Sequence, residues 1–150
     1  MKKVIKLRTA KNDDLDFLYN LHKSTLREYI DQIWGWDEKW QRKYFSQRFE
    51  LEELQIITLE GIDIGSISVI HKDQEIFLNR IEILPEYQNR GIGTCLIKKI
   101  MINAQSKGKS ITLQVFKINK RARKLYEGLG FSICGETRTH YQMKYSPNNQ

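Results

Sequence analysis

The sequence reads Gln88-Asn89-Arg90-Gly91-Ile92-Gly93-Thr94 between an expected strand, residues 75–84, and an expected helix, residues 92–107. Two glycines one residue apart let the backbone turn tightly and bring bare N–H groups close to a ligand. The first N–H groups of a helix are unpaired and carry a partial positive charge, which favours phosphate. The stretch lacks both the third glycine of a dinucleotide fingerprint and the Gly-Lys-Ser/Thr of a P-loop. An ordinary turn and a phosphate-binding turn therefore both fit this stretch.

Hydrophobic periodicity predicts the other elements along the chain. Apolar residues at helical spacing predict helices over residues 15–33 and 37–49, and a third helix runs from a cap at Asn119 to a stop at Gly130. In the helix over 37–49, we expect Trp40, Tyr44, Phe45 and Phe49 to form the apolar side. Strands are expected at residues 4–7, 54–59, 62–71, 75–84, 110–116, 131–134 and 140–145. Because strands and helices mix without strict alternation, we predict an α/β fold with a mixed sheet.

Length and composition favour one domain over residues 1–150. The chain is 40% hydrophobic, which is enough for a real core. We find no segment that could span a membrane and expect a cytoplasmic protein. The formal net charge of +7 comes from basic residues spread along the chain, so we expect no nucleic-acid partner. A basic surface equally suits an anionic small molecule.

The cysteines and histidines carry no metal-site pattern. Cys95 and Cys134 are the only cysteines, and we expect both to be buried small side chains, not a disulfide or metal ligands. Cys95 is the less certain of the two, because a helix N-terminus lowers a thiol pKa. The three histidines are scattered along the chain. We therefore expect no metal.

Two blocks of sequence resemble the GNAT superfamily of acetyl-CoA-dependent N-acetyltransferases. Leu84-Pro-Glu-Tyr-Gln-Asn-Arg-Gly-Ile-Gly93 resembles the family signature Gln/Arg-x-x-Gly-x-Gly/Ala, which Gln88, Gly91 and Gly93 match. The later block Asn119-Lys-Arg-Ala-Arg-Lys-Leu-Tyr-Glu-Gly-Leu-Gly-Phe131 resembles Asn-x-x-Ala-x-x-Leu-Tyr-Glu-x-x-Gly-Phe. The blocks stand in the family's order and at its usual separation, and the chain is identified as a member on both.

The resemblance implies a fold and a cofactor. The fold is a central mixed sheet of about seven strands, splayed between the fourth and fifth strands and flanked by about four helices. Acetyl-CoA is the implied co-substrate and lies in the opening; the partner is an amine acceptor, and a homodimer is left open. The positions implied to contact the cofactor are Ile81, Glu82, Ile83, Leu84, Gln88, Asn89, Arg90, Gly91, Ile92, Gly93, Thr94, Asn119, Arg123 and Tyr126.

Three of these positions have a second interpretation. Arg123 belongs to a basic group around the second block, which fits a solvated helix face as well as a phosphate-facing one. Asn119 fits a helix cap and also a contact to the pantetheine arm. Tyr126 fits a packed tyrosine, but in this motif we expect it to meet the leaving thiolate as a hydrogen-bond donor. In the strand before the motif, residues 81–84 are implied to supply the N–H donor for the oxyanion, with Ile83 the strongest candidate.

The general base is where the chain departs from the family pattern. Several relatives have a glutamate on the fifth strand, whereas this chain has Gln114, which cannot accept a proton at neutral pH. Glu82 is the best substitute, acting directly or through water, although an ordinary exposed strand carboxylate fits it equally well. His140 is a weaker candidate. An amine that arrives neutral from solution would need no base.

The acceptor side is expected to lie in residues 29–41, with Tyr29, Trp34 and Trp36 as contacts and His140 as a fourth. Aromatic faces and carboxylates suit a cationic amine. Hydrophobic packing is the alternative, and we expect it for at least two of the three tryptophans, Trp34, Trp36 and Trp40.

These expectations combine into one function with an alternative. We expect an N-acetyltransferase that transfers an acetyl group from acetyl-CoA to a primary amine of a small molecule or a protein, by direct attack in a ternary complex. The alternative is a non-catalytic acyl-CoA-binding module on the same fold, which Gln114 supports. A nucleic-acid-binding domain would rest on charge alone.

Overall fold

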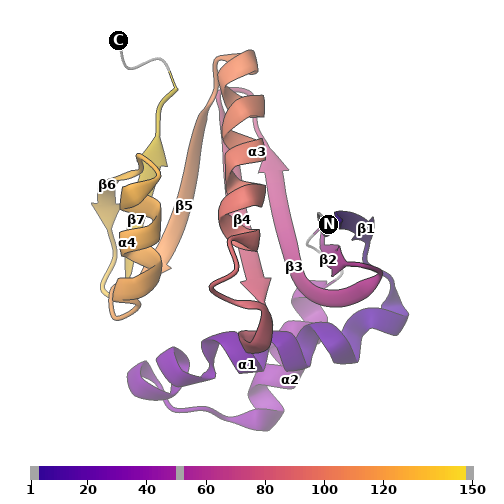
Figure 1. The fold of residues 1–150 in the computed structure, drawn as a ribbon. Coiled ribbons are helices and arrows are strands. Elements are labelled where there is room, and N and C mark those ends of the chain that lie inside the picture. The colour runs from indigo at the N-terminus through magenta and orange to yellow at the C-terminus, as the bar shows by residue number, and fades with distance from the viewer. Residues whose placement is uncertain (1–3, 50–52, 148–150) are drawn as a thin grey trace. The chain divides into compact units, whose positions relative to one another are not determined.

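The computed structural model describes residues 4–49 and 53–147. The chain forms two compact units, one of Met1–Val69 with Arg80–Thr94 (unit 1) and one of Ile70–Asn79 with Cys95–Gln150 (unit 2). The strands are hydrogen-bonded neighbours in a seven-stranded sheet of order β1-β2-β3-β4-β5-β7-β6 (Figure 1). The fold is the predicted mixed α/β one.

The elements follow the predicted boundaries closely. In chain order they are β1 (Ile5–Thr9), a short 3-10 helix η1 (Asn12–Asp14), α1 (Leu15–Ile33), α2 (Glu38–Phe49), β2 (Gln55–Leu59), β3 (Ile62–His71), β4 (Glu75–Ile83), η2 (Pro85–Tyr87), α3 (Ile92–Lys107), β5 (Ser110–Phe116), α4 (Lys120–Gly128), β6 (Ser132–Glu136) and β7 (His140–Tyr145). Every predicted helix and strand is present.

Unit 1 is built on antiparallel strands and the first two long helices. β1 pairs with β2, Ile5 opposite Leu59, and β2 pairs with β3, Gln55 opposite Ile67. A shared core joins these helices to β2; its buried members are Leu18, Tyr19, Phe45, Leu54 and Ile56. Its apolar character explains the helical spacing of α1, because residues three and four apart share one face of a helix.

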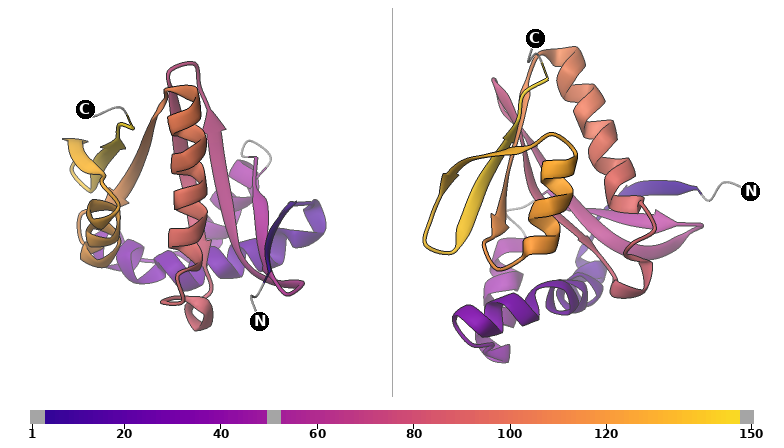
Figure 2. Two further views of the ribbon diagram at one scale, coloured as in Figure 1. Left: turned by 45° about the horizontal axis from the view of Figure 1, so that its top comes forward. Right: turned by 60° about the vertical axis from the view of Figure 1, so that its left-hand side comes forward.

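Unit 2 is built around a parallel pair and a closing hairpin. β4 and β5 pair in parallel from Glu75 opposite Ser110, and α3 is the crossover between them (Figure 1). A parallel connection needs such a crossover, since a short turn can join only antiparallel strands. β5 then pairs antiparallel with β7, and β7 with β6. Figure 2 shows α4 beside the β6–β7 hairpin.

Two expectations about burial are wrong. Trp40 and Tyr44 are 56% and 43% exposed and stack on each other. Phe45 is buried and Phe49 packs against the core, as expected, and Gln41 is the other buried residue of α2. Both cysteines are exposed, and Cys134 lies in β6, at the edge of the sheet. In each case the apolar pattern indicated the element correctly, but it could not indicate which face meets the core.

A close approach of two backbones fixes the end of β4 in unit 1. Leu84 donates its N–H to the carbonyl of Ile64 in β3, at 2.8 Å. Next to that bond, a Cβ added to Gly65 would collide with the carbonyl oxygen of Glu82, and it would lie 3.2 Å from the Cα of Ile83. Glycine inside a strand often marks such an approach. Because Gly65 has no side chain, the backbone of β4 can lie this close to the backbone of β3.

We predict that Gly65→Ala lowers thermal stability, because the added methyl group meets rigid backbone and must push β3 and β4 apart. The matched control is Gly128→Ala in α4, where the added carbon would have nothing within 4 Å. There alanine should be neutral or stabilising by up to about 1 kcal/mol. Thermal denaturation followed by circular dichroism measures both. Equal melting temperatures for the two variants would contradict the constraint.

Candidate active site

The end of β4 presents one backbone N–H away from its neighbour β3. N–H groups of successive residues in a strand point to opposite sides, and that of Leu84 points to β3. The N–H and carbonyl of Ile83 therefore point to the other side. The carbonyl of Ile83 accepts a hydrogen bond from the side-chain amide of Gln88, at 2.8 Å. This geometry suits the oxyanion donor expected at Ile83.

The turn between η2 and α3 has the backbone conformation that its sequence suggests. Asn89 and Gly91 have positive φ angles, 64° and 79°, and α3 begins directly afterwards at Ile92. Asparagine and glycine are the residues that adopt this left-handed conformation most readily. Gly93 lies within the first turn of the helix, where N–H groups have no intrahelical partner. The turn can thus direct several N–H groups at an anion.

Two polar side chains of this turn support its shape. The side chain of Gln88 is hydrogen-bonded to the carbonyl of Ile83, and this contact connects the turn to the end of β4. Arg90 donates to the carbonyl of Glu86, at 2.9 Å, and its guanidinium lies 5.1 Å from the ring centre of Tyr87. Both side chains thereby stabilise the turn.

Glu82 is buried, in contrast to the exposed strand carboxylate that was one interpretation of it. The residue is 6% exposed. Its Oε2 lies 3.2 Å from Nδ1 of His22 and accepts a hydrogen bond from the hydroxyl of Thr25, at 2.9 Å. Its Oε1 lies 3.4 Å from Nη1 of Arg80, on the same strand. We call these four residues the Glu82 cluster; it joins α1 to β4 within unit 1.

The cluster keeps Glu82 ionised. Burial alone would raise the pKa of this carboxyl, but the hydrogen bond from His22, the charge of Arg80 and the hydroxyl of Thr25 together outweigh it and lower the pKa. A carboxylate with a lowered pKa is a weak proton acceptor. Glu82 is thus a stable anion at neutral pH, and this limits its strength as a base acting alone.

The expected acceptor segment is only partly packed. Trp36 packs against the core of unit 1, donates its indole N–H to Glu38 at 3.1 Å, and has the guanidinium of Arg27 5.8 Å from its ring centre. Trp34 is 56% exposed, and Tyr29 is partly buried. Since Trp34 and Trp40 are both exposed, the expectation that at least two of the three tryptophans belong to the core is wrong.

Glu38 is not a free anion for a cationic acceptor. Lys23 donates to it at 2.8 Å and Tyr19 at 2.9 Å, in addition to the indole of Trp36. These hydrogen bonds, that of Lys23 first, lower the pKa of Glu38 to about 2. The carboxylate therefore serves mainly to hold the start of α2 against α1.

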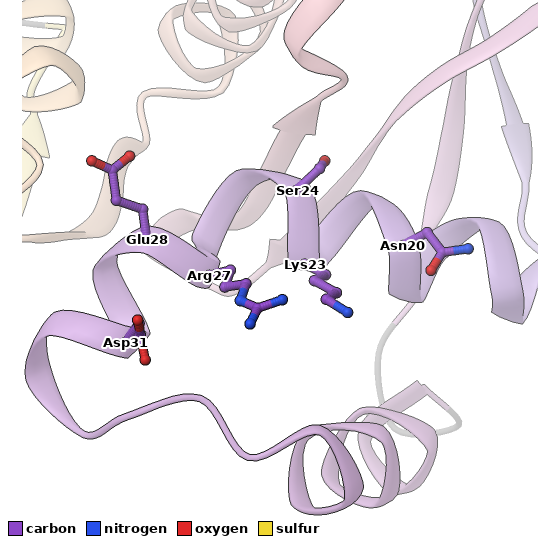
Figure 3. Close-up of a pocket in the computed structure, with 6 residues that line it drawn as sticks. All are labelled: Asn20, Lys23, Ser24, Arg27, Glu28 and Asp31. Carbon is purple, nitrogen blue, oxygen red and sulfur yellow. The ribbon is translucent and has the colours of Figure 1, made fainter.

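A shallow hollow of about 540 Å³ lies along α1 (Figure 3). It is lined by Asn20, Lys23, Ser24, Arg27, Glu28 and Asp31. Figure 3 shows Lys23 and Arg27 on the side of the helix that faces the chain leading to α2, with Ser24 and Glu28 on the opposite side. The lining comes from one helix and carries both signs of charge, and it includes none of the predicted site residues.

In unit 2, the start of α4 carries the second motif. Asn119 caps the helix, because its side-chain oxygen accepts the N–H of Ala122 at 3.1 Å. Arg123 lies one turn further on, with its guanidinium 5.5 Å from the ring centre of Tyr141 and its Nε 3.7 Å from Glu127. Nε of Arg123 is one of two buried side-chain atoms without a hydrogen-bond partner in the described part of the chain.

Tyr126 is partly buried on α4 and packs edge-on against Phe131, with ring centres 5.8 Å apart. Burial raises the pKa of Tyr126 to about 12. The hydroxyl therefore stays protonated throughout the neutral range and remains a hydrogen-bond donor. Both interpretations of this tyrosine, packing and donation, fit its surroundings.

His140 and Gln114 lie on neighbouring strands of unit 2. His140 begins β7 opposite Phe116, with ring centres 4.2 Å apart, and its Nδ1 lies 2.8 Å from the hydroxyl of Thr139. Burial lowers the pKa of His140, so its ring is neutral at pH 7. Gln114 is exposed on β5 opposite Gln142. This part of the sheet thus carries the neutral imidazole of His140 and the amide of Gln114.

The structure brings some predicted site residues together and adds others. Residues 81–84 and 88–94 lie in unit 1 with Tyr29, Trp34 and Trp36; Asn119, Arg123, Tyr126 and His140 lie in unit 2. Three members of the Glu82 cluster, His22, Thr25 and Arg80, were not predicted from the sequence. The available signal was a histidine at an apolar position of the helix over 15–33, where a polar ring needs a partner.

The described residues include no group of three or more His, Cys, Asp or Glu side chains that could hold a metal ion. Likewise, none of the helices in residues 4–49 and 53–147 is long and apolar enough to cross a membrane.

The lowered pKa of Glu82 predicts a pH dependence of stability. A group whose pKa is lower in the folded state stabilises it fully above the unfolded value, about 4.3 for glutamate, and this stabilisation is lost as pH falls through the folded value. The free energy of unfolding should therefore drop below about pH 4.5, and Glu82→Gln should reduce that drop while lowering stability at pH 7.

Urea denaturation between pH 7 and pH 3 measures this effect. Glu86→Gln, which changes an exposed carboxylate outside the cluster, is the matched control and should retain the wild-type pH dependence. If Glu82→Gln and Glu86→Gln gave the same curve, the cluster would not be what keeps Glu82 ionised.

Comparison with known proteins indicates the family of the chain. The model of the acetyltransferase (GNAT) family matches residues 15–131. An uncharacterized N-acetyltransferase of Methanocaldococcus jannaschii is 31% identical over 139 residues, which cover 86% of this chain and 61% of that protein. A thialysine N-epsilon-acetyltransferase of Bos taurus is 45% identical over 60 residues, 39% of this chain and 35% of that protein. The matches thus span less than two thirds of either relative.

The fold has a solved counterpart. The crystal structure of the PaiA N-acetyltransferase from Thermoplasma acidophilum, in complex with coenzyme A, superposes with a TM-score of 0.75 and 18% identity, covering 95% of this chain and 99% of that one. At this identity the likeness concerns the fold alone. Since the family model covers most of the chain, from α1 into the second motif, the chain belongs to the acetyltransferase (GNAT) family.

Proposed function

We propose that the chain is an N-acetyltransferase that transfers an acetyl group from acetyl-CoA to a primary amine by direct attack in a ternary complex. The observation that carries the proposal is the arrangement in unit 1, where the N–H of Ile83 points away from β3 next to a turn with Asn89 and Gly91 in the left-handed conformation. The N–H of Ile83 suits an oxyanion, and the N–H groups of the turn suit a pyrophosphate. We further propose one functional domain, since the family match runs through both units.

The proposed roles follow the chemistry of the thioester. Ile83 N–H stabilises the tetrahedral oxyanion, and the N–H groups of residues 91–94 bind the pyrophosphate. The hydroxyl of Tyr126 donates a hydrogen bond to the leaving thiolate, which its protonated state supports. Asn119 and Arg123 contact the cofactor, and Tyr29, Trp34, Trp36 and His140 contact the acceptor. The proposal covers two classes of acceptor, an amine of a small molecule and an amine of a protein. The cytoplasmic location and the homodimer stay predictions.

A non-catalytic acyl-CoA-binding module is the second candidate. It is favoured by Gln114 in place of the family glutamate and by the low basicity of Glu82. Release of coenzyme A thiol separates the two candidates. Acetyl-CoA is incubated with a polyamine, L-lysine, an aminoglycoside or a peptide with a free N-terminus. Amine-dependent release supports the enzyme, whereas acetyl-CoA binding without release from any acceptor supports the module.

We predict that Gly93→Glu abolishes acetyl-CoA binding in a folded protein. A Cβ at Gly93 makes only an ordinary contact, 3.5 Å from the Ile83 side chain, and an acidic side chain is tolerated in the first turn of a helix. The new charge would repel the pyrophosphate. Isothermal calorimetry measures the affinity, and Gly93→Ala is the control for size without charge. Wild-type affinity in folded Gly93→Glu would remove the phosphate assignment.

We predict that Tyr126→Phe lowers turnover by about 100- to 10,000-fold, the usual cost of a lost proton donor in the transition state. The ring and its contact with Phe131 remain, so melting temperature and acetyl-CoA affinity should change little. Steady-state thiol release and calorimetry are the measurements. Turnover equal to wild type would refute the role, and joint loss of stability and turnover would indicate a structural hydroxyl instead.

A further inference from the structure

The Glu82 cluster contains a group that the proposed mechanism does not use. His22 on α1 is 9% exposed and lies near two aromatic rings, with ring centres 5.2 Å from it for Phe45 and 6.5 Å for Trp36. One nitrogen, Nδ1, makes both of its polar contacts, to Glu82 at 3.2 Å and to Arg80 at 3.1 Å. An imidazole held in this way by a carboxylate resembles the oriented base of a catalytic triad in its physical logic.

The two contacts of Nδ1 compete, because one nitrogen cannot both donate to Glu82 and accept from Arg80. Both partners are charged, so the strength of the hydrogen bond does not by itself choose between them. A lone pair of Nδ1 aimed at the buried anion would, however, be repelled. Arg80 loses little, since its Nη1 also reaches Oε1 of Glu82, at 3.4 Å. The tautomer with hydrogen on Nδ1 is therefore favoured.

That tautomer leaves the other ring nitrogen as a proton acceptor. The two nitrogens of imidazole point in divergent directions, so Nε2 faces away from Glu82. Nε2 has no hydrogen-bond partner among residues 4–49 and 53–147, and the side chain keeps 11% of its exposure. Nε2 is thus the basic atom of the cluster that remains available to a substrate.

We propose that His22, not Glu82 by itself, accepts the proton of the acceptor amine, and that Glu82 is the residue that positions its ring. This rests on the proposed acetyl transfer. Nε2 of His22 takes one proton from the incoming ammonium and later releases it to solvent. The neutral amine then attacks the thioester carbon; the C–N bond forms, the C–S bond breaks, and a second amine proton ends on the thiol of coenzyme A.

The charges around His22 support this role. The groups that face the ring are the carboxylate of Glu82 and the guanidinium of Arg80 from β4, the neutral hydroxyl of Thr25 from α1 and the two aromatic rings. Arg80 and Glu82 cancel each other while the ring is neutral. When Nε2 gains a proton, the ring has one anion, Glu82, and one cation, Arg80, within contact distance of Nδ1. This balance suits a base that must also release its proton.

The test is His22→Asn, with Thr25→Val as the matched control. The asparagine amide can occupy the place of Nδ1 and donate to Glu82, but the variant has no second nitrogen. Thr25→Val removes a different hydrogen bond to the same oxygen of Glu82. Thiol release is measured from pH 6 to pH 10 with the best acceptor among spermidine, L-lysine, kanamycin and a free peptide N-terminus.

We expect His22→Asn to lower the rate about 100-fold or more at pH 7 and to recover as pH approaches the pKa of the amine, with acetyl-CoA affinity unchanged. Thr25→Val should lower the melting temperature yet retain the wild-type pH dependence. Nitrogen-15 NMR of the histidines should show hydrogen on Nδ1 of His22 and none on Nε2.

A wild-type pH profile in His22→Asn, or hydrogen on Nε2 in the neutral protein, would overturn the inference and leave the acetyl transfer standing. An equal change of pH profile in Thr25→Val would also overturn the inference. The change would then come from any loss of a hydrogen bond to Glu82, not from the loss of Nε2 of His22. If wild-type protein releases no thiol with any of the four acceptors, the proposed function fails first, and the role of His22 fails with it.

Discussion

The structure of unit 1 depends on a buried negative charge. A carboxylate taken out of water is costly unless donors surround it, and Glu82 is 6% exposed on β4. Its donors come from two elements distant in sequence, His22 and Thr25 on α1 and Arg80 on β4. Separating α1 from β4 would remove the two donors that α1 supplies and leave only Arg80 beside this charge. The carboxylate therefore holds the first helix against the strand that presents the proposed oxyanion donor.

One strand consequently serves two purposes within a few residues. Side chains alternate across a strand, and successive N–H groups alternate between its two edges. The side chain of Glu82 belongs to the cluster, while the N–H of Ile83 points away from β3. On the side of β3, the N–H of Leu84 is hydrogen-bonded to the carbonyl of Ile64. Gly65 lets the two backbones come this close. The same short piece of β4 thus sets the positions of the proposed oxyanion donor and of the Glu82 cluster.

The titratable groups of the two units are tuned in opposite ways. In unit 1, hydrogen bonds and a neighbouring cation outweigh burial and keep Glu82 ionised. In unit 2, burial acts without a charged partner and raises the pKa of Tyr126 to about 12, so that its hydroxyl stays protonated. Environments that push apart the protonation states of two groups commonly mark acid and base roles. Here they support one residue as an anchor for a base and the other as a donor.

Much of this protein was determined by its sequence alone. The helix over 92–107 and the strands over 62–71 and 110–116 were predicted to the residue, because periodicity, caps and glycine stops act over a few neighbouring positions. The two motif blocks likewise indicated the family. Tertiary structure decided what each face meets: Trp40, Tyr44 and both cysteines are exposed, and Glu82 is buried. The partnership of Glu82 with His22 joins residues 60 positions apart, so no local pattern could reveal it, and only packing of α1 on β4 creates it.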